Sequence, residues 1–289
     1  MGTAEVLSGM KAQLAGTVVF IFQPAEEGPG GAEPMIRAGV LDNPKVDAIF
    51  GLHVWPGPAG DITYRAGPAM AASNSFSITV RGRQTHGANP WGGVDPIVIG
   101  SQTVLGMQTI VSRQIDITVA PAIVTVAIFE GGIRSNIIPD SAVLEGTIRT
   151  FDRGQRQLIF DKIATTAKQI ALSGGGTADV RIDSGYPVTR NDESLTERMV
   201  PSLRRAAGTN TVAVGPLVTG AEDFSHFEER VPGMFVFLGV TPRERDFRKA
   251  AANHSPYFFA DESALPVGVR TTASLALDYL AGTTPPPVP

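Results

Sequence analysis

The sequence contains no cysteine and only four histidines. Disulfide bonds and thiolate ligands are therefore excluded, and a bound metal would have to be held by histidine, aspartate and glutamate. No apolar run approaches the roughly 20 residues that cross a bilayer, so no membrane association is expected. The first residues have neither the basic nor the long apolar region of a secretory signal, so we expect a cytoplasmic protein.

Basic residues are fewer than acidic residues. Lys and Arg total 24 against 28 Asp and Glu, for a net charge of -4, and the basic residues are scattered along the chain. This balance argues against a nucleic-acid partner. Length and apolar content are plentiful: 289 residues with 43% hydrophobic and 18% charged side chains are typical of a folded globular protein. At roughly 150 residues per domain, about two domains are expected.

The first and last parts of the chain, residues 1–71 and 187–282, show helix and strand patterns in alternation. Near-continuous apolar strands between helices are typical of a parallel or mixed sheet that helices cover. We predict that the two parts form one α/β domain, followed by a disordered tail at 283–289. The elements predicted in this domain are buried strands at 17–22, 48–53 and 234–240, helices at 3–13, 32–38, 193–207 and 265–280, and a helix that begins at Glu222.

The middle part, residues 72–186, has a different pattern. Phe76, Ile78 and Val80 alternate with polar residues, as in a strand that is buried on one face. The order of patterns in this part is β-α-β-β-α-β, which predicts two helices on a four-stranded antiparallel sheet of the ferredoxin-like kind, inserted into the α/β domain as a satellite. After the first strand, the predicted elements are a helix at 95–113, strands at 123–129 and 143–150, a helix at 153–172 and a strand at 178–182.

Two adjacent acids, Glu26 and Glu27, follow the apolar strand pattern at 17–22. The carboxyl ends of strands are where sites assemble in open α/β sheets, so one acid could bind a metal while the other acts as general base. The alternative is a solvated acidic loop, because carboxylates on loops are common.

His53 ends the next strand pattern, and His254 lies in a polar turn before the last helix. A neutral imidazole at a strand end suits a zinc-type site, although a single histidine there could equally bond a backbone carbonyl. Together with Glu27, these histidines offer acceptable ligand types on three loops of one sheet.

The satellite part carries two further candidates, His86 and Asn136. His86 lies between a strand and a flexible glycine and could polarise an oxyanion, whereas Asn136 could donate an amide hydrogen bond to a carboxylate or oxyanion. The alternative for both is an ordinary turn residue. The last histidine, His226, has no partner pattern and is interpreted as structural.

Taken in order, seven segments give the chain a close resemblance to the metal-dependent amidohydrolases related to hippurate hydrolase, N-acyl-amino-acid deacylases and auxin-conjugate hydrolases. No single segment is decisive, but their order along the whole chain is. The segments are Phe22-Gln23-Pro24-Ala25-Glu26-Glu27-Gly28, Gly51-Leu52-His53-Val54-Trp55-Pro56, Thr85-His86-Gly87-Ala88, Ser135-Asn136-Ile137-Ile138-Pro139-Asp140, Gly146-Thr147-Ile148-Arg149-Thr150-Phe151, Ala221-Glu222-Asp223-Phe224-Ser225 and His254-Ser255-Pro256.

The resemblance implies a role for each candidate residue. Glu26 resembles the general base that deprotonates a metal-activated water. Glu27, His53 and His254 resemble ligands of a divalent metal, zinc or manganese. His86 and Asn136 resemble residues that contact the substrate carboxylate or the tetrahedral oxyanion, often across the interface of a homodimer. The implied substrate is an N-acyl amino acid.

The resemblance also implies a departure from the family pattern. Relatives carry a segment of the type His-Ala-Cys-Gly-His-Asp-Gly-His before the first helix, which supplies a cysteine and a histidine ligand. This sequence shows no such segment, so we expect at most one metal site. The expected fold is a zinc-peptidase-like mixed sheet, incomplete at its N-terminus, with an inserted ferredoxin-like satellite domain that mediates dimerisation.

Three functions follow as hypotheses. The first is amide hydrolysis of N-acyl amino acids. The second is a hydrolase with mainly carboxylesterase activity, because an ester has a better leaving group than an amide. The third is a catalytically impaired protein that oligomerises or binds a ligand.

Overall fold

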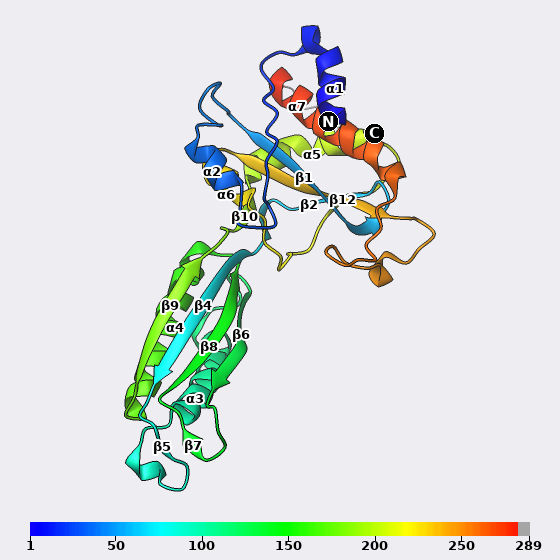
Figure 1. Ribbon diagram of the computed structural model, residues 1–289. Coiled ribbons are helices and arrows are strands. Elements are labelled where there is room, and N and C mark those ends of the chain that lie inside the picture. Colours follow the sequence, from blue (N-terminus) through cyan, green and yellow to red (C-terminus); the bar gives the residue numbers. More distant parts are fainter. Residues whose placement is uncertain (283–289) are drawn as a thin grey trace. The chain divides into compact units, whose positions relative to one another are not determined.

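The structure, a computed structural model, describes residues 1–282 of the chain in two compact units (Figure 1). Unit 1 contains residues 1–69, 189–218 and the described residues from 222 onward. Unit 2 contains Met70–Val188 together with Thr219–Ala221. The bounds of 72–186 expected for the satellite lie within two residues of the longer segment of unit 2.

Unit 1 is built on a mixed four-stranded sheet in the order β1-β12-β2-β11. The central strand β12 runs parallel to β1 and antiparallel to β2, and β2 is parallel to β11. All nine residues of β12 are buried, because strands and helices cover this apolar segment. The sheet strands are β1 (Ile49–Pro58), β2 (Ile62–Tyr64), β11 (Val212–Val214) and β12 (Gly233–Thr241).

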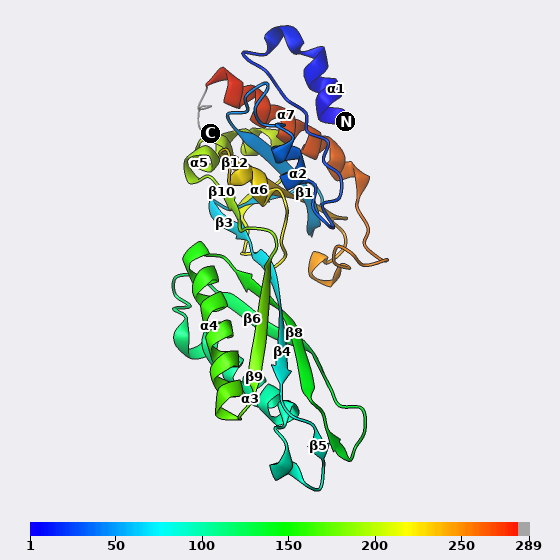
Figure 2. The ribbon, with the colours of Figure 1, turned by 60° about the vertical axis from the view of Figure 1, so that its left-hand side comes forward.

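The helices of unit 1 pack on this sheet and on one another (Figure 2). Helices α5 and α7 contact each other, and α1 contacts α7. Helix α5 begins where the Asp192 carboxylate accepts a hydrogen bond from the backbone N–H of Leu195 at 2.7 Å, which satisfies one of its unpaired donors. The helices are α1 (Gly2–Gly9), α2 (Ala32–Arg37), α5 (Glu193–Ala207), α6 (Ser225–Glu228) and α7 (Leu265–Ala281).

The strand predicted at 17–22 is wrong. Residues 17–25 belong to no helix or strand, and two of the apolar side chains are exposed, Phe20 to 39% and Phe22 to 64%. A run of apolar residues indicates that a segment tends to be buried. To form a strand, the segment also needs a neighbouring strand whose free backbone donors and acceptors can form hydrogen bonds with it. Within the described residues, β1 lies at the edge of its sheet and pairs only with β12.

Three predicted helices differ from the structure. The helix predicted at 3–13 divides into α1 (Gly2–Gly9) and a 3₁₀ turn at Lys11–Gln13. The helix expected to begin at Glu222 begins at Ser225 and has four residues, because Glu222 and Asp223 lie in the turn before it. The helix predicted at 95–113 divides into α3 (Pro96–Thr109) and a π-helical turn at Ile110–Gln114. Hydrophobic periodicity does not distinguish these helical forms, because they differ only in local hydrogen bonding.

Unit 2 has the predicted order β-α-β-β-α-β, with four antiparallel strands in the spatial order β6-β8-β4-β9. Helices α3 and α4 contact each other and pack against this sheet. A small antiparallel pair, β5 (Thr85–His86) with β7 (Ile137–Ile138), is added to that order. The sheet strands are β4 (Ala72–Arg81), β6 (Ala122–Gly131), β8 (Ser141–Thr150) and β9 (Thr177–Ser184), and α4 spans Arg153–Ser173.

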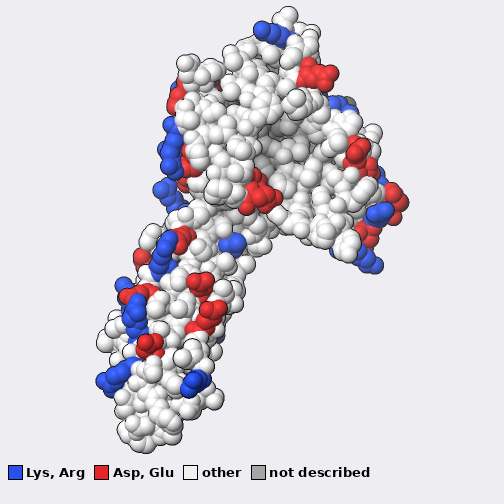
Figure 3. All heavy atoms as spheres, viewed as in Figure 1, with Lys and Arg blue, Asp and Glu red and all other residues white. Residues whose placement is uncertain are grey.

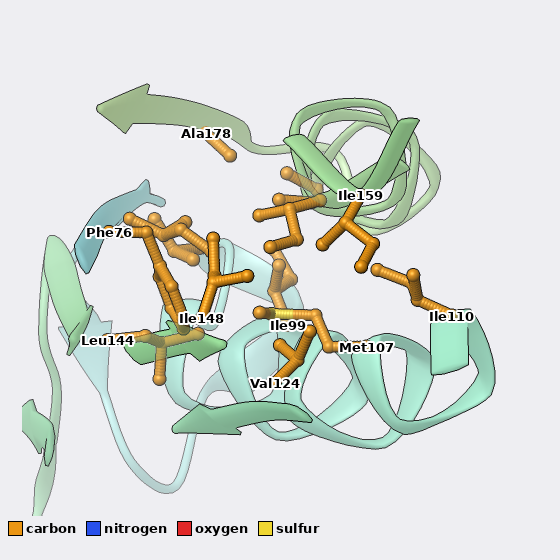
Figure 4. Close-up of a cluster of buried hydrophobic side chains, with 14 of the residues drawn as sticks. Phe76, Ile99, Met107, Ile110, Val124, Leu144, Ile148, Ile159 and Ala178 are labelled. Atoms are coloured by element: carbon orange, nitrogen blue, oxygen red, sulfur yellow. The ribbon is translucent and has the colours of Figure 1, made fainter. Parts of the chain in front are cut away.

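The core of unit 2 provides a test of its packing (Figure 4). Ile148 is fully buried among side chains of the sheet and both helices. Replacing Ile148 by Ala is expected to lower the free energy of unfolding of unit 2 by about 2 to 5 kcal/mol, through lost burial and the cavity left behind. Hydrogen exchange of the β4 and β8 amides in increasing urea measures this loss. Leu172→Ala, at an exposed position of α4, is the control, and an equal effect of the two substitutions would contradict the assignment of the core.

The remaining elements are short. Strands β3 (Gly67–Met70) and β10 (Thr189–Asn191) pair with each other. In residues 1–282, 3₁₀ turns lie at Lys11–Gln13, Pro90–Gly92, Phe247–Lys249 and Glu262–Ala264. The tail predicted at 283–289 lies outside the described residues. In the part that the structure describes, no helix is long and apolar enough to span a membrane.

Candidate metal centre

The two adjacent acids lie on a tight loop, residues 24–30, between the extended segment and α2. The carbonyl of Ala25 accepts hydrogen bonds from the backbone N–H groups of Gly28 and Gly30, at 3.1 and 2.9 Å. Ala25 itself has a left-handed backbone with φ of 58°, a conformation that costs a non-glycine residue energy. At the end of the loop, a Cβ on Gly31 would lie 1.9 Å from the carbonyl oxygen of Pro24, so only glycine fits there. The loop therefore holds Glu26 and Glu27 in a constrained conformation.

Glu26 belongs to a group of three acids. Ligand atoms of Glu26, Glu222 and Asp223 all lie within 4.8 Å of one another, with Glu26 half-buried and the other two buried. Burial raises the pKa of Glu26, and the negative charges of Glu27 and Asp223 raise it further. Burial is also the main cause that raises the pKa of Glu222 to about 8. At neutral pH, Glu222 is thus mostly protonated, and Glu26 is a stronger base than an exposed glutamate.

Glu27 lies beside one of the predicted histidine ligands. His254 Nδ1 is 3.6 Å from Glu27 Oε2, and both side chains are exposed. Zinc takes nitrogen and carboxylate oxygen ligands at about 2.0 to 2.2 Å, so two ligands of one tetrahedral ion are separated by about 3.4 Å. His254 has φ of 70°, a left-handed conformation that non-glycine residues rarely adopt. Backbone strain of this kind is common at functional sites.

The prediction that His53 ends a strand at 48–53 is wrong: β1 continues to Pro58, so His53 lies near the middle of the strand. There it contacts the aromatic rings of Trp55, Phe235 and Phe237. Its Nδ1 is 2.6 Å from the carbonyl oxygen of Val54. Because a carbonyl only accepts, Nδ1 carries the proton, and Nε2 of the neutral ring is left as a metal-binding lone pair. The same carbonyl accepts a hydrogen bond from Asn253 Nδ2 at 3.0 Å, which ties the turn that carries His254 to β1.

These residues fit a divalent metal by the chemistry of their donors. Two histidines and one glutamate, with an open fourth position, are an established ligand set for a catalytic zinc ion. The structure brings Glu27 and His254 together and orients the ring of His53 through Val54. It does not bring His53 into one ligand group with them: among the described residues, the group of three whose ligand atoms all lie within 4.8 Å of one another is Glu26, Glu222 and Asp223. The acidic group of Glu26, Glu222 and Asp223 could also bind a cation, although Asp223 already accepts three hydrogen bonds.

A cavity of about 840 Å³ in unit 1 is lined by Glu26, His53 and Glu222. Its other walls are largely apolar, from the extended segment 17–22, the strand β1 and the helix α7. Figure 3 shows this unit hollowed, with uncharged walls and an acidic patch at the border of the hollow. A mostly apolar cavity with a few polar groups that converge on it is typical of a small-molecule site.

The two candidates of the satellite part lie together in unit 2. His86 is in β5, and the backbone N–H of Gly87 donates to the carbonyl of Asn136 at 2.7 Å. His86 Nδ1 accepts a hydrogen bond from the backbone N–H of Ala88 at 3.0 Å, so the ring is oriented within its own turn. Both side chains are exposed. Their part in the site of unit 1 stays a prediction.

Sequence reasoning gave no role to Gln23, Glu222 or Asp223, although all three lie in segments that carry the resemblance. Gln23 and Asp223 are 200 positions apart, yet Gln23 Nε2 donates to Asp223 Oδ1 at 2.6 Å. Residues so far apart form no repeating pattern along the chain, so the sequence gives no sign that they are hydrogen-bonded. A signal was nonetheless present: two adjacent acids in an otherwise apolar context, Ala221-Glu222-Asp223-Phe224.

Fold and site together define a class: a mixed α/β protein whose carboxylates and histidines are suited to bind a divalent metal. Residues 1–278 match the sequence model of peptidase family M20/M25/M40, and the chain belongs to that family. The resemblance drawn from the sequence is thereby confirmed, as are the metallohydrolase class and a divalent metal of the zinc or manganese type as its cofactor.

The relatives include proteins with named activities. An IAA-amino acid hydrolase, ILR1-like 4 of Arabidopsis thaliana, is 37% identical over 97% of this chain and 64% of its own length. An N-acetylcysteine deacetylase of Bacillus subtilis is 37% identical over 97% of this chain and 71% of its own length. The chain therefore spans about two thirds of the length of these relatives.

Among solved structures, the YXEP protein of Bacillus subtilis, described as a dinuclear metal-binding peptidase of the M20 family, matches with a TM-score of 0.79. It is 33% identical, and the match covers 98% of this chain and 70% of that one. The dinuclear centre is a property of that protein. For this chain, the expectation of at most one metal site stays a prediction.

Proposed function

We propose that this protein hydrolyses the amide bond of N-acyl amino acids, with Glu26 as the general base. The observation that carries the proposal is the placement of Glu26. Its carboxylate lines the cavity, its pKa is raised by burial, and the next residue, Glu27, lies beside His254. A carboxylate whose pKa is raised towards neutral pH is suited to take a proton and return it within one reaction cycle.

The residues of the chain divide the chemistry between them. Glu27, His53 and His254 would hold the metal, which supplies Lewis-acid polarisation of the scissile carbonyl when bound. Glu26 removes a proton from the attacking water, whose oxygen forms a bond to the carbonyl carbon. The carbon–nitrogen bond then breaks, and the proton that Glu26 holds passes to the leaving nitrogen. The products are a carboxylic acid and a free amino acid.

The choice of substrate class is supported by the names of two relatives. One is an IAA-amino acid hydrolase and the other an N-acetylcysteine deacetylase. The cavity also suits an acyl group, because most of its wall is apolar and its charged residues gather at a few positions.

The experiment compares amide and ester turnover with metal content. The purified chain is desalted into metal-free buffer, loaded with Zn²⁺ or Mn²⁺, and assayed with N-acetyl, N-benzoyl and indole-acetyl amino acids and with a p-nitrophenyl ester. Amide turnover that chelation abolishes supports the proposal. Ester turnover that persists through chelation would favour the carboxylesterase hypothesis, and metal or ligand binding without turnover would favour a catalytically impaired protein.

We further propose that His86 and Asn136 reach a substrate through a homodimer in which unit 2 forms the interface. Their side chains are exposed in unit 2, and the β5–β7 pair brings their backbones together. His86→Ala is expected to lower kcat by on the order of 10²-fold, the usual cost of removing one oxyanion donor. Steady-state kinetics measures the loss, and light scattering after size exclusion reports the oligomeric state. His226→Ala, on α6 of unit 1, is the control. An unchanged kcat in His86→Ala would remove unit 2 from the active site.

A further inference from the structure

Asp223 contacts both ends of the loop that carries Glu26 and Glu27. At the start of the loop, Gln23 Nε2 donates to Asp223 Oδ1 at 2.6 Å. At its end, the backbone N–H groups of Gly31 and Ala32 donate to Asp223 Oδ2 at 2.8 and 3.0 Å. The side chain of Asp223 is fully buried; its hydrogen bonds from Gly31 and Ala32 are shielded from water, and that from Gln23 is partly buried. Hydrogen bonds to a charged acceptor in such a place are short and strong.

Asp223 also contacts the proposed general base directly. Its backbone N–H donates a hydrogen bond to the carboxylate of Glu26. Asp223 therefore forms hydrogen bonds with Gln23 before the loop, with Gly31 and Ala32 after it, and with the carboxylate of Glu26 within it. Asp223 is distant from the loop in sequence, and the turn that carries it precedes α6.

The loop needs such support because its backbone is strained. Ala25, immediately before Glu26, has φ of 58°. A non-glycine residue persists in this region only where the surrounding structure overdetermines its conformation. Gly31 also lies close to the carbonyl of Pro24, at the other end of the loop. This close approach persists only if the surrounding structure holds the two ends of the loop together.

We propose that Asp223 is a positioning residue. Its hydrogen bonds with Gln23, Gly31 and Ala32, which we call the latch, keep the two ends of the 24–30 loop together and so hold the carboxylate of Glu26 at the cavity. This inference rests on the proposed function for the role of Glu26, whereas the latch itself is a property of the fold. Displacement of a reacting group by about 1 Å costs on the order of 10²-fold in rate, so a latch of this kind affects catalysis without touching substrate.

Three substitutions separate geometry from charge. Asp223→Ala removes the acceptor of three donors. Gln23→Met releases only the start of the loop and keeps the contacts of Asp223 with Gly31 and Ala32. Asp223→Asn is the conservative variant: its carbonyl can accept from Gly31 and Ala32, and the amide of Gln23 can turn so that its oxygen accepts from the new amide. Asp192→Ala is the matched control, because Asp192 accepts a backbone hydrogen bond at the start of α5.

The first readout is hydrogen exchange of the metal-free protein, which requires no turnover. In Asp223→Ala, exchange across residues 24–32 is expected to be at least about tenfold faster than in the wild type, while the amides of β12 keep their protection. Asp223→Asn is expected to resemble the wild type, and Asp192→Ala to loosen α5 alone. If the loop of Asp223→Ala exchanges as slowly as that of the wild type, the latch does not exist. Should Asp223→Ala fail to fold, Gln23→Met carries the same test for the first half of the loop.

The second readout is the division between kcat and KM at saturating metal. Asp223→Ala and Gln23→Met are expected to lower kcat by roughly 10- to 100-fold with KM within about threefold, and Asp223→Asn is expected to restore kcat. A loosened loop with unchanged kcat would overturn the positioning role, as would an equal loss in Asp223→Asn, which would assign the effect to charge. A wild-type protein without amide turnover, whose loop is still loosened in Asp223→Ala, would refute the proposed function and leave the latch in place.

Discussion

Replacing Glu26 by Gln is expected to lower kcat for an N-acyl amino acid by about 10²- to 10⁴-fold, the range that general acid–base catalysis contributes. The amide has nearly the same shape as the carboxylate but cannot take a proton from water or return it to the leaving nitrogen. KM and the number of metal ions per chain are expected to stay unchanged, because Glu27, His53 and His254 are retained. Steady-state kinetics and elemental analysis of the same preparation measure both.

The control for this prediction is Glu145→Gln, an exposed glutamate on β8 of unit 2. It loses one negative charge, as Glu26→Gln does, but lies outside the proposed site. Turnover in Glu26→Gln within threefold of the wild type would refute Glu26 as the base. A parallel loss of metal would instead make Glu26 a ligand.

A second large effect is expected in the pH dependence of stability, and it arises at Glu228 on α6. Burial raises the pKa of Glu228 to about 8, against a hydrogen bond from the backbone N–H of Arg190 that lowers it. Its Oε1 is buried without a hydrogen-bond partner, whereas Oε2 accepts from Arg190 at 2.6 Å. Because the pKa is higher in the folded state, the folded protein binds more protons than the unfolded chain between pH 4.5 and about 8.

The sign follows from that difference in bound protons. The contribution of Glu228 to stability is fully present below pH 4.5 and is lost as the pH rises through about 8. One pKa unit corresponds to about 1.4 kcal/mol, so a rise of the pKa from 4.5 to about 8 makes the loss on the order of 5 kcal/mol. Glu228→Gln, a neutral side chain of the same shape, is expected to be about as stable as the wild type near pH 5 and to exceed it by a few kcal/mol near pH 9.

Urea denaturation at a series of pH values measures this difference. Glu222, whose pKa is also raised to about 8, titrates in both proteins, so the difference between them reports Glu228 together with its electrostatic interaction with Glu222. Glu229→Gln, at the exposed neighbouring position, is the control. A difference between Glu228→Gln and the wild type that does not change with pH would show that Glu228 is ionised in the folded protein at neutral pH.

Much of the fold could be predicted from the sequence. The helix at 193–207 has its predicted bounds, and the strand at 234–240 extends by one residue at each end. In unit 2, Phe76, Ile78 and Val80 are buried on one face of β4, as their alternation predicts. These segments were predictable because each combines a strong local periodicity with a clear start or stop signal.

The prediction at 17–22 failed for a reason that local patterns cannot express. The segment has the composition of a buried strand, but pairing is a property of two segments, and in the described structure no strand pairs with it. The helix expected from Glu222 failed differently: Asp223 is used to bind Gln23, Gly31 and Ala32, so the chain turns there before α6 begins.

The sequence by itself determined the residue types of the site and their order along the chain. It supplied carboxylates and imidazoles without cysteine, because residue type and order can be read directly from the sequence. Its placement of Glu26, Glu27 and His53 at strand ends was wrong, because no strand forms at 17–22 and β1 continues to Pro58. Only the tertiary structure decided which of them meet. The Glu27–His254 approach, the raised pKa values of Glu26 and Glu222, and the hold of Asp223 on the loop depend on burial and on distances between segments about 200 residues apart. Desolvation and hydrogen bonding act through space, so they exist only once the chain has folded.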